Sequence, residues 1–399
     1  MSAHDRPQAT SIMEVLRASL RLGLTSFGGP IAHIGYFRRE YVERRRWLDE
    51  TTYADLVALC QLLPGPASSQ LGILIGTRRA GMVGGIVAWL GFTLPSAFVL
   101  VLFGLLTQTA DVSAAGWVAG LKIAAVSIVA QAVYAMARVL TPDVPRLAIA
   151  VLAAVGVLSV TVPAAQVAIV IGGAMVGRIL LPPPTVGPTE PRTSPISRRV
   201  GIICLVAFFG LLLGLPILQV LGGDGVLRAF DAFYRSGSLV FGGGHVVLPL
   251  LHAEVVGPGW VSNDQFLAGY GAAQAVPGPL FTFAAYLGAV SSAPPNGWFG
   301  GAIALVAIFL PSFLLVFGAV PFWDRLREWP AFRRALLGAN AAVVGILAAA
   351  LYTPIWTSAI SAPIDAALAA LALALLVWAR AAPVLVVALC AVAGQLIGR

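Results

Sequence analysis

The sequence predicts an all-α polytopic membrane protein built from two inverted-topology repeats with re-entrant or broken helices. Three observations support this prediction: an apolar composition, a set of motifs that recurs once along the chain, and arginines whose placement is reversed between the two copies. Hydrophobic residues form 59% of the 399 and charged residues only 11%, and the mean hydropathy is +0.90. Because soluble domains carry about 25% charged residues, we expect most of this chain to lie in lipid.

The charge pattern favours a multi-pass protein of the bacterial inner membrane. The net charge of +8 comes almost entirely from arginine, since Lys122 is the only lysine. Most arginines stand in short polar breaks between apolar segments, where they act as cytoplasmic anchors under the positive-inside rule. We therefore expect a lipid bilayer as the surroundings and no nucleic-acid partner.

Two motifs recur in the same order and divide the chain into halves. Phe-Gly-Gly occurs at residues 27–29 and again at 241–243, and Pro-Gly-Pro occurs at 64–66 and again at 277–279. Internal repeats of this kind are typical of secondary transporters. The predicted organisation is an N-terminal repeat (1–180), a Pro-rich cytoplasmic linker (181–199), a connecting transmembrane helix (200–221) and a C-terminal inverted repeat (222–399).

Arginine placement predicts that the two repeats have opposite orientations. Residues 38–46 contain five arginines, whereas the matching stretch 245–264 contains none. Since arginines accumulate on the cytoplasmic side, equivalent loops of the two repeats are expected on opposite faces. The uncharged segment 200–221 is long enough to cross about 30 Å of hydrocarbon. As one extra crossing between the repeats, it would place the second repeat in the opposite orientation.

Residues 53–77 and their counterpart 266–288 are predicted to be re-entrant helical hairpins. Residues 53–77 have arginines on both flanks and residues 266–288 have no Arg or Lys on either flank, whereas a simple crossing should have opposite flanks. Pro-Gly-Pro also splits each segment into apolar pieces of about eleven residues. Such pieces are too short to span, and broken backbone at membrane depth is found only where protein or a wet cavity surrounds it. Whether the glycine-broken segment before each hairpin is another hairpin or a kinked crossing stays open at this point.

The two Pro-Gly-Pro turns are the predicted oxyanion site. Helix N-termini present unpaired N–H groups and a partial positive charge, so two tips that enter from opposite faces would hold an anion between Gly65 and Gly278. The alternative is that Gly and Pro are simply frequent in membrane helices. The candidate substrate-binding residues are Phe27, Gly28, Gly29, Gln61, Pro64, Gly65, Pro66, Ser68, Ser69, Phe241, Gly242, Gly243, His245, Gln274, Pro277, Gly278 and Pro279.

Charged residues near these motifs give further candidates. Lys122 is expected to offset the charge of a bound dianion, or else to extend its stem to the membrane interface; the second repeat has Asn340 at that position. His33, Glu40 and Glu254 are candidates for coupling transport to protons, with solvation or pairing to arginine as the alternative. The sequence contains no metal-ligand spacing, nucleophile elbow or Walker motif, so we expect no metal, no cofactor and no enzymatic activity.

Taken together, the segments around the Phe-Gly-Gly and Pro-Gly-Pro motifs, including residues 24–48, 61–70 and 271–289, resemble the chromate ion transporter family in its long two-domain form. The resemblance covers nearly the whole chain. It implies export of chromate from the cytoplasm by alternating access and chromate resistance, with sulfate as a similar tetrahedral dianion. The alternatives are an anion channel or a transporter of sulfate or another oxyanion. A homodimer is one candidate assembly, and the sequence does not fix the oligomeric state.

Overall fold

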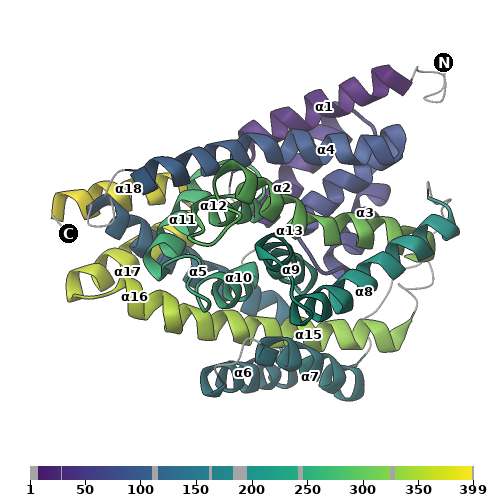
Figure 1. Ribbon diagram of the computed structural model, residues 1–399. Coiled ribbons are helices and arrows are strands. Elements are labelled where there is room, and N and C mark those ends of the chain that lie inside the picture. Colours follow the sequence, from purple (N-terminus) through teal and green to yellow (C-terminus); the bar gives the residue numbers. More distant parts are fainter. Residues whose placement is uncertain are drawn as a thin grey trace.

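The computed structural model describes residues 8–27, 29–109, 116–160, 164–182, 196–240, 246–323 and 329–397, and all regular secondary structure in these ranges is helical. Five helices are long and apolar enough to cross a membrane. They are Ala67–Gln108, Gly116–Leu140, Arg198–Val220, Gly297–Phe322 and Pro330–Ala359. Long helices run across the view in Figure 1, and shorter ones fill the space between them. The prediction of an all-α polytopic membrane protein is confirmed.

Helices occur in both halves of the chain. The first half contains α1 (Gln8–Thr25), α2 (Gly29–Arg38), a π-helical turn (Arg39–Arg44), α3 (Glu50–Leu62), α4 (Ala67–Thr109), α5 (Gly116–Leu140), α6 (Val144–Ser159) and α7 (Ala164–Leu180). The second half contains α8 (Arg198–Val220), α9 (Gly225–Ser238), α10 (Val247–Val255), α11 (Asn263–Ala275), a 3-10 turn (Leu280–Thr282), α12 (Phe283–Val290), α13 (Gly297–Ala319), α15 (Pro330–Ala350), a π-helical turn (Leu351–Trp356), α16 (Thr357–Ala359), α17 (Pro363–Val377) and α18 (Pro383–Ile397).

The segment around the first Pro-Gly-Pro is a re-entrant hairpin, which confirms the prediction. α3 is followed by residues 63–66, which are not helical, and α4 is itself broken at Ala80 and Gly81. The first hairpin therefore consists of α3 and residues 67–79, two legs of thirteen residues. Each leg is about 20 Å long, too short to span. The Arg79 guanidinium, at the end of the second leg, lies 5.1 Å from the centroid of the Trp47 ring, which precedes the first leg. The two legs therefore begin and end at the same side of the molecule.

The second hairpin, formed by α11, the 3-10 turn and α12, closes in the same way. Ser262 caps α11 by accepting a hydrogen bond from the Gln265 N–H, just as Asp49 caps α3 through the Thr52 N–H. At the open end of the hairpin, just before α11 and just after α12, the Ser292 N–H donates to the Trp260 carbonyl at 2.8 Å. Trp260 and Ser292 thus repeat the pairing of Trp47 and Arg79.

The two hairpins open at opposite ends of one long helix. Residues 82–109 of α4 begin directly after the first hairpin, and the Gln108 amide at their other end donates to the Val290 carbonyl at 2.8 Å, where the second hairpin ends. About 40 Å of helix separates these ends. We call the end of the molecule with Trp47 and Arg79 the Trp47 face, and the end with Trp260 and Ser292 the Trp260 face.

The segment before each hairpin, which the sequence left open, also folds back on itself. In the first half Arg21 of α1 lies beside Glu40 of the π-helical turn. In the second half Arg235 of α9 contacts Glu254 of α10. Contacts across the glycine breaks therefore make these segments hairpins too.

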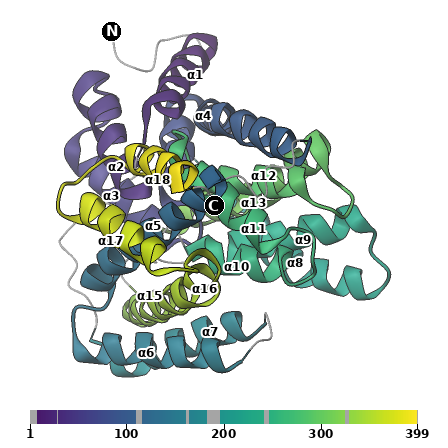
Figure 2. The ribbon, with the colours of Figure 1, turned by 90° about the vertical axis from the view of Figure 1, so that its left-hand side faces the viewer.

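The last two helices of each repeat pack against a helix of the other repeat. α6 and α7 pack along α15, whereas α17 and α18 pack along α5, as both views show (Figure 1, Figure 2). Close approach depends on small residues. A Cβ added at Gly338 of α15 would lie 2.0 Å from the Gly173 carbonyl oxygen, and one at Gly120 of α5 would lie 2.1 Å from the Cys390 carbonyl oxygen. The two halves are therefore intertwined.

Candidate functional site

Each Pro-Gly-Pro turn is built around a glycine with left-handed backbone geometry. Gly65 has φ +117° and Gly278 has φ +103°, a region that residues with a Cβ occupy only with strain. The flanking prolines have no N–H to donate, so in each turn the glycine supplies the only amide. The turn ends one helical leg and starts the next at the depth where the hairpin reverses.

The two tips cross over and bind the opposite repeat. The Gly65 N–H donates to the Val240 carbonyl at 2.7 Å, and the Gly278 N–H donates to the Ser26 carbonyl at 2.9 Å. Val240 and Ser26 each stand directly before a Phe-Gly-Gly motif. The two glycine amides are thus already bonded to the protein, which differs from the expectation that they would face an anion.

Two serines of a second repeated motif lie against the tips. A Cβ on Gly65 would be 3.0 Å from Ser312 Oγ, and a Cβ on Gly278 would be 2.8 Å from Ser96 Oγ. These serines end the Leu-Pro-Ser motifs of the two long helices, each in the repeat opposite to the tip that it touches. Leu-Pro-Ser occurs at residues 94–96 and again at 310–312, but only the fold shows that both copies adjoin the tips.

Buried polar atoms without a partner gather around this crossing. In the part of the chain that the structure describes, they include Ser26 Oγ, Ser69 Oγ, Gln70 Oε1, Thr93 Oγ1, Gln274 Nε2 and Ser312 Oγ. All six residues are at most 9% exposed. An unpaired buried polar group costs about 1–3 kcal/mol, so a cluster of them indicates a site that a polar guest completes.

The start of α4 adds backbone donors to the same place. The first N–H groups of a helix have no carbonyl within the helix to bind; the first intrahelical bond here is from the Gln70 N–H to the Pro66 carbonyl, at 3.0 Å. The N–H groups of Ser68 and Ser69 therefore precede that bond, beside the unpartnered Ser69 hydroxyl. Such a helix terminus favours an anion.

His33 connects the two tips. Its Nδ1 lies 3.2 Å from Ser68 Oγ, and its Nε2 lies 3.2 Å from the Ser26 carbonyl oxygen that also receives the Gly278 N–H. The side chain is 1% exposed. The residue at the equivalent spacing in the second half is Val247, so the sequence has an imidazole at this position in the first half only. Of the three predicted coupling residues, His33 is the one whose partners, Ser68 and the Ser26 carbonyl, adjoin the tips.

The other predicted site residues fall into three groups. Pro66, Ser68, Ser69, Gln274 and Pro279 are buried at the crossing. Phe27, Gly29, Pro64 and Pro277 are partly buried beside it, whereas Gln61 is exposed. Gly28 and the second motif (Phe241, Gly242, Gly243 and His245) lie outside the described residues.

Lys122 is held away from the crossing. Its Nζ lies 2.9 Å from Asp264 Oδ1, at the start of α11. Ten residues of helix, about 15 Å, separate Asp264 from Gln274 near the tip. Lys122 thus lies toward the Trp260 face, and the expected contact with a dianion between the tips is not made here. Asn340, its counterpart, is partly buried on α15.

Glu40 and Glu254 also lie outside the crossing and are paired with arginines. Glu40 contacts Arg44 and Arg45 at 3.0 and 2.6 Å, and Glu254 contacts Arg235 at 2.9 Å. This agrees with the alternative reading of these glutamates, which was pairing to arginine. They do not touch the Pro-Gly-Pro turns.

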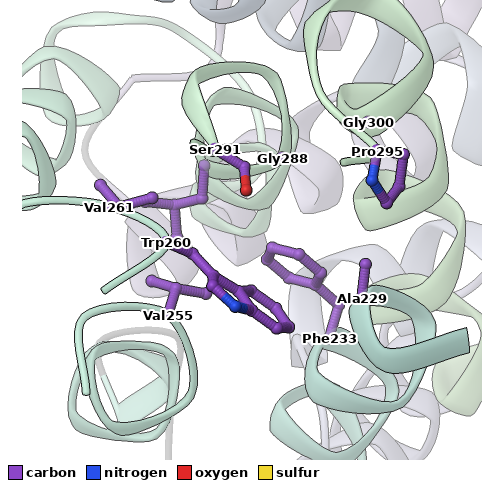
Figure 3. A pocket seen from close by; sticks show the side chains of 10 residues that line it. Ala229, Phe233, Val255, Trp260, Val261, Gly288, Ser291, Pro295 and Gly300 are labelled. Carbon is purple, nitrogen blue, oxygen red and sulfur yellow. The ribbon is translucent and has the colours of Figure 1, made fainter. Parts of the chain in front are cut away.

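The pocket drawn in Figure 3 lies near the Trp260 face. Figure 3 shows Trp260 beside Phe233 and Val255, with Ser291 and Pro295 across the pocket. Its volume of about 10 Å³ accommodates roughly one water molecule, and its lining is largely apolar. It does not resemble a site for a dianion.

Two crossed re-entrant hairpins from inverted repeats, with unpartnered buried polar atoms at the crossing, define a membrane transporter of small polar or anionic solutes. The family model described as chromate transporter matches residues 13–178 and 227–395. The chain belongs to the chromate transporter family.

Relatives agree with this assignment. The chain is 31% identical to the chromate transport protein of Pseudomonas aeruginosa over 86% of this chain and 81% of that one. It is 28% identical to the chromate transport protein of Cupriavidus metallidurans, over 88% and 84% of the two chains. The uncharacterized transporter YwrA of Bacillus subtilis is 36% identical over 116 residues, which are 29% of this chain and 63% of that protein. That relative is about half as long as this chain. No solved structure matches.

Proposed function

We propose that this protein exports chromate from the cytoplasm as a secondary transporter and so gives chromate resistance. The crossing of the two tips is the proposed binding site, and the cluster of unpartnered buried polar atoms is the observation that carries the proposal. Hydroxyl, amide and helix-terminal N–H donors suit a tetrahedral oxyanion, which accepts hydrogen bonds on every side. Sulfate has the same shape and charge and is the expected competitor.

Alternating access is the proposed mechanism, with residues 13–178 and 227–395 as the two repeat units. Each tip is bonded to the opposite repeat through one backbone hydrogen bond, so rocking of one repeat against the other changes both tips together. His33 contacts Ser68 at the start of α4 and the Ser26 carbonyl that binds the second tip, and it is the proposed site of coupling to protons.

The arginine pattern gives the orientation of the protein, and the membrane potential supports the direction of transport. The Trp47 face carries the arginines of residues 38–46 together with Arg79. We assign this face to the cytoplasm of a bacterial inner membrane under the positive-inside rule. A dianion that leaves a cell with a negative interior gains about 4.6 kcal/mol per 100 mV. Export can therefore run on the membrane potential.

Chromate uptake into inverted membrane vesicles tests the proposal. The wild-type protein is expected to give saturable uptake, driven by a positive vesicle interior and inhibited by sulfate. Gly65→Leu is expected to abolish it, because the side chain meets Gln70 and Ser312. Gly210→Leu is the matched control, since a Cβ there meets nothing within 4 Å. Wild-type vesicles that take up no more chromate than empty ones would overturn the function, and an active Gly65→Leu would overturn the site. Resolvable unitary currents would identify a channel instead of a carrier.

A further inference from the structure

Two ion pairs occupy equivalent positions in the two repeats. Arg21 lies 3.8 Å from Glu40, and Arg235 lies 2.9 Å from Glu254. In each case the arginine stands five residues before the carbonyl that binds a tip, Ser26 or Val240, and the glutamate stands fourteen residues after it. The spacing is therefore the same in both copies, and the pairs are related by the repeat.

Each pair ties together the two arms of a glycine-broken hairpin. Arg21 is on α1 and Glu40 is in the π-helical turn after α2, and a Ser19–Tyr41 contact of 3.4 Å joins the same two arms. Arg235 is on α9 and Glu254 is on α10. The sequence between the arms is rich in glycine in both halves, and each ion pair adds a side-chain contact between the two arms.

The pairs lie on opposite sides of the crossing. On α1, Glu14 contacts Arg79 at the Trp47 face and Ser26 reaches the crossing, so Arg21 lies between the two. Glu254 is followed by Val255, whose carbonyl accepts the Trp260 N–H at 2.9 Å. The second pair therefore lies between the crossing and the Trp260 face, and Val255, the residue after Glu254, lines the small pocket of Figure 3.

The two pairs differ in charge. Glu40 is surrounded by Arg21, Arg44 and Arg45, which leaves two positive charges uncompensated. In the second repeat Arg235 faces two carboxylates, Glu254 and Asp231, which leaves one negative charge. Asp231 occupies the position that Arg17 holds in the first repeat. The Trp47 side thus attracts a dianion, and the Trp260 side repels one.

We propose that Arg21–Glu40 and Arg235–Glu254 are the two gates of the transport path and that each arginine is a transient oxyanion-binding site. A guanidinium binds carboxylates and tetrahedral oxyanions with the same donor geometry, so an arriving oxyanion competes with the glutamate and releases the arm. The charge difference favours capture at the Trp47 face and release at the Trp260 face. This inference rests on the proposed function, because it assumes that the crossing binds an oxyanion.

Cysteine labelling from each side of the membrane tests the gates. Ser312→Cys, at the crossing, is made in a chain whose free cysteines Cys60, Cys204 and Cys390 are replaced and which retains chromate uptake. A membrane-impermeant cationic thiosulfonate is added to inverted or right-side-out vesicles without substrate. We expect Glu40→Gln to raise labelling at least tenfold from the Trp47 face only, and Glu254→Gln to raise it at least tenfold from the Trp260 face only.

Controls separate loss of a gate from loss of the fold. Glu43→Gln removes a carboxylate that pairs with Arg38 at the exposed surface and is expected to leave both labelling rates within twofold. Glu40→Asp and Glu254→Asp keep the charge and should restore slow labelling. Where a glutamine variant does not fold, Arg21→Gln or Arg235→Gln tests the same gate and should open the same face.

The outcomes distinguish this inference from the proposed function. Labelling does not require transport, so a protein with gated labelling and no chromate uptake would overturn the function but keep the gates. Glutamine variants that leave labelling unchanged, or that both open the same face, would overturn the gates while uptake by the wild type still supports the function.

Discussion

Alanine at Gly278 tests whether the crossed tips are needed for transport. A residue with a Cβ at φ +103° carries a strain of about 1–3 kcal/mol. The new Cβ would also lie 2.8 Å from Ser96 Oγ and 3.2 Å from the Phe92 carbonyl oxygen, and overpacking of this kind adds about 1–3 kcal/mol, part of which Ser96 relieves by rotating. We therefore expect the docked tip to lose about 2–4 kcal/mol.

Each 1.4 kcal/mol corresponds to a factor of ten, so chromate uptake by Gly278→Ala should fall by a factor between about 30 and several hundred. The assay is initial uptake into inverted vesicles, normalised to the amount of folded protein. Gly259→Ala is the matched control, because Gly259 also has a left-handed φ, +79°, but its Cβ would meet nothing within 4 Å. It should retain uptake within about threefold.

A second substitution separates the backbone strain at residue 278 from the steric contact of its Cβ with Ser96. In Gly278→Ala with Ser96→Ala, the hydroxyl nearest to the new Cβ is gone but the backbone strain stays, so uptake should recover in part and not fully. Wild-type uptake by Gly278→Ala at normal expression would refute the reasoning, because the tip would then not depend on its backbone geometry.

Four further substitutions test other parts of the structure. Ser69→Ala and Ser312→Ala remove unpartnered buried hydroxyls, so thermal stability in detergent should hold or rise while chromate affinity measured by uptake falls; a fall in stability alone would contradict the site. Lys122→Ala should cost no more than about 1 kcal/mol of stability, since Asp264 is mostly exposed, and should leave chromate affinity within twofold; a large loss of affinity would place Lys122 in the path. Gly338→Ala should lower the melting temperature by several degrees, because its Cβ would lie 2.0 Å from a carbonyl oxygen of α7; an unchanged melting temperature would disprove this helix contact.

The arrangement of the repeats explains why half of the chain would be incomplete by itself. The tip of each hairpin bonds to a carbonyl of the other half, and the last two helices of each half cover α5 or α15 of the other. A repeat alone would lack both contacts.

The sequence by itself determined the membrane class, the duplication and the re-entrant hairpins. These follow from local properties: hydropathy sets where a chain lies, motif spacing is preserved by duplication, and two pieces of about eleven residues cannot reach across hydrocarbon. Arginine placement likewise predicted the inversion, which the shared helix α4 now shows through Arg79 at one end and Gln108 at the other.

Only the tertiary structure decided what the tips touch. Gly65 and Val240 are 175 residues apart, and Gly278 and Ser26 are 252 apart, so no local pattern indicates that their backbones are bonded. The same separation in sequence hid the position of Ser96 and Ser312 beside the tips and the pairing of Lys122 with Asp264. Which buried polar groups lack a partner depends on the packing of both repeats together, and a single sequence contains no record of that packing.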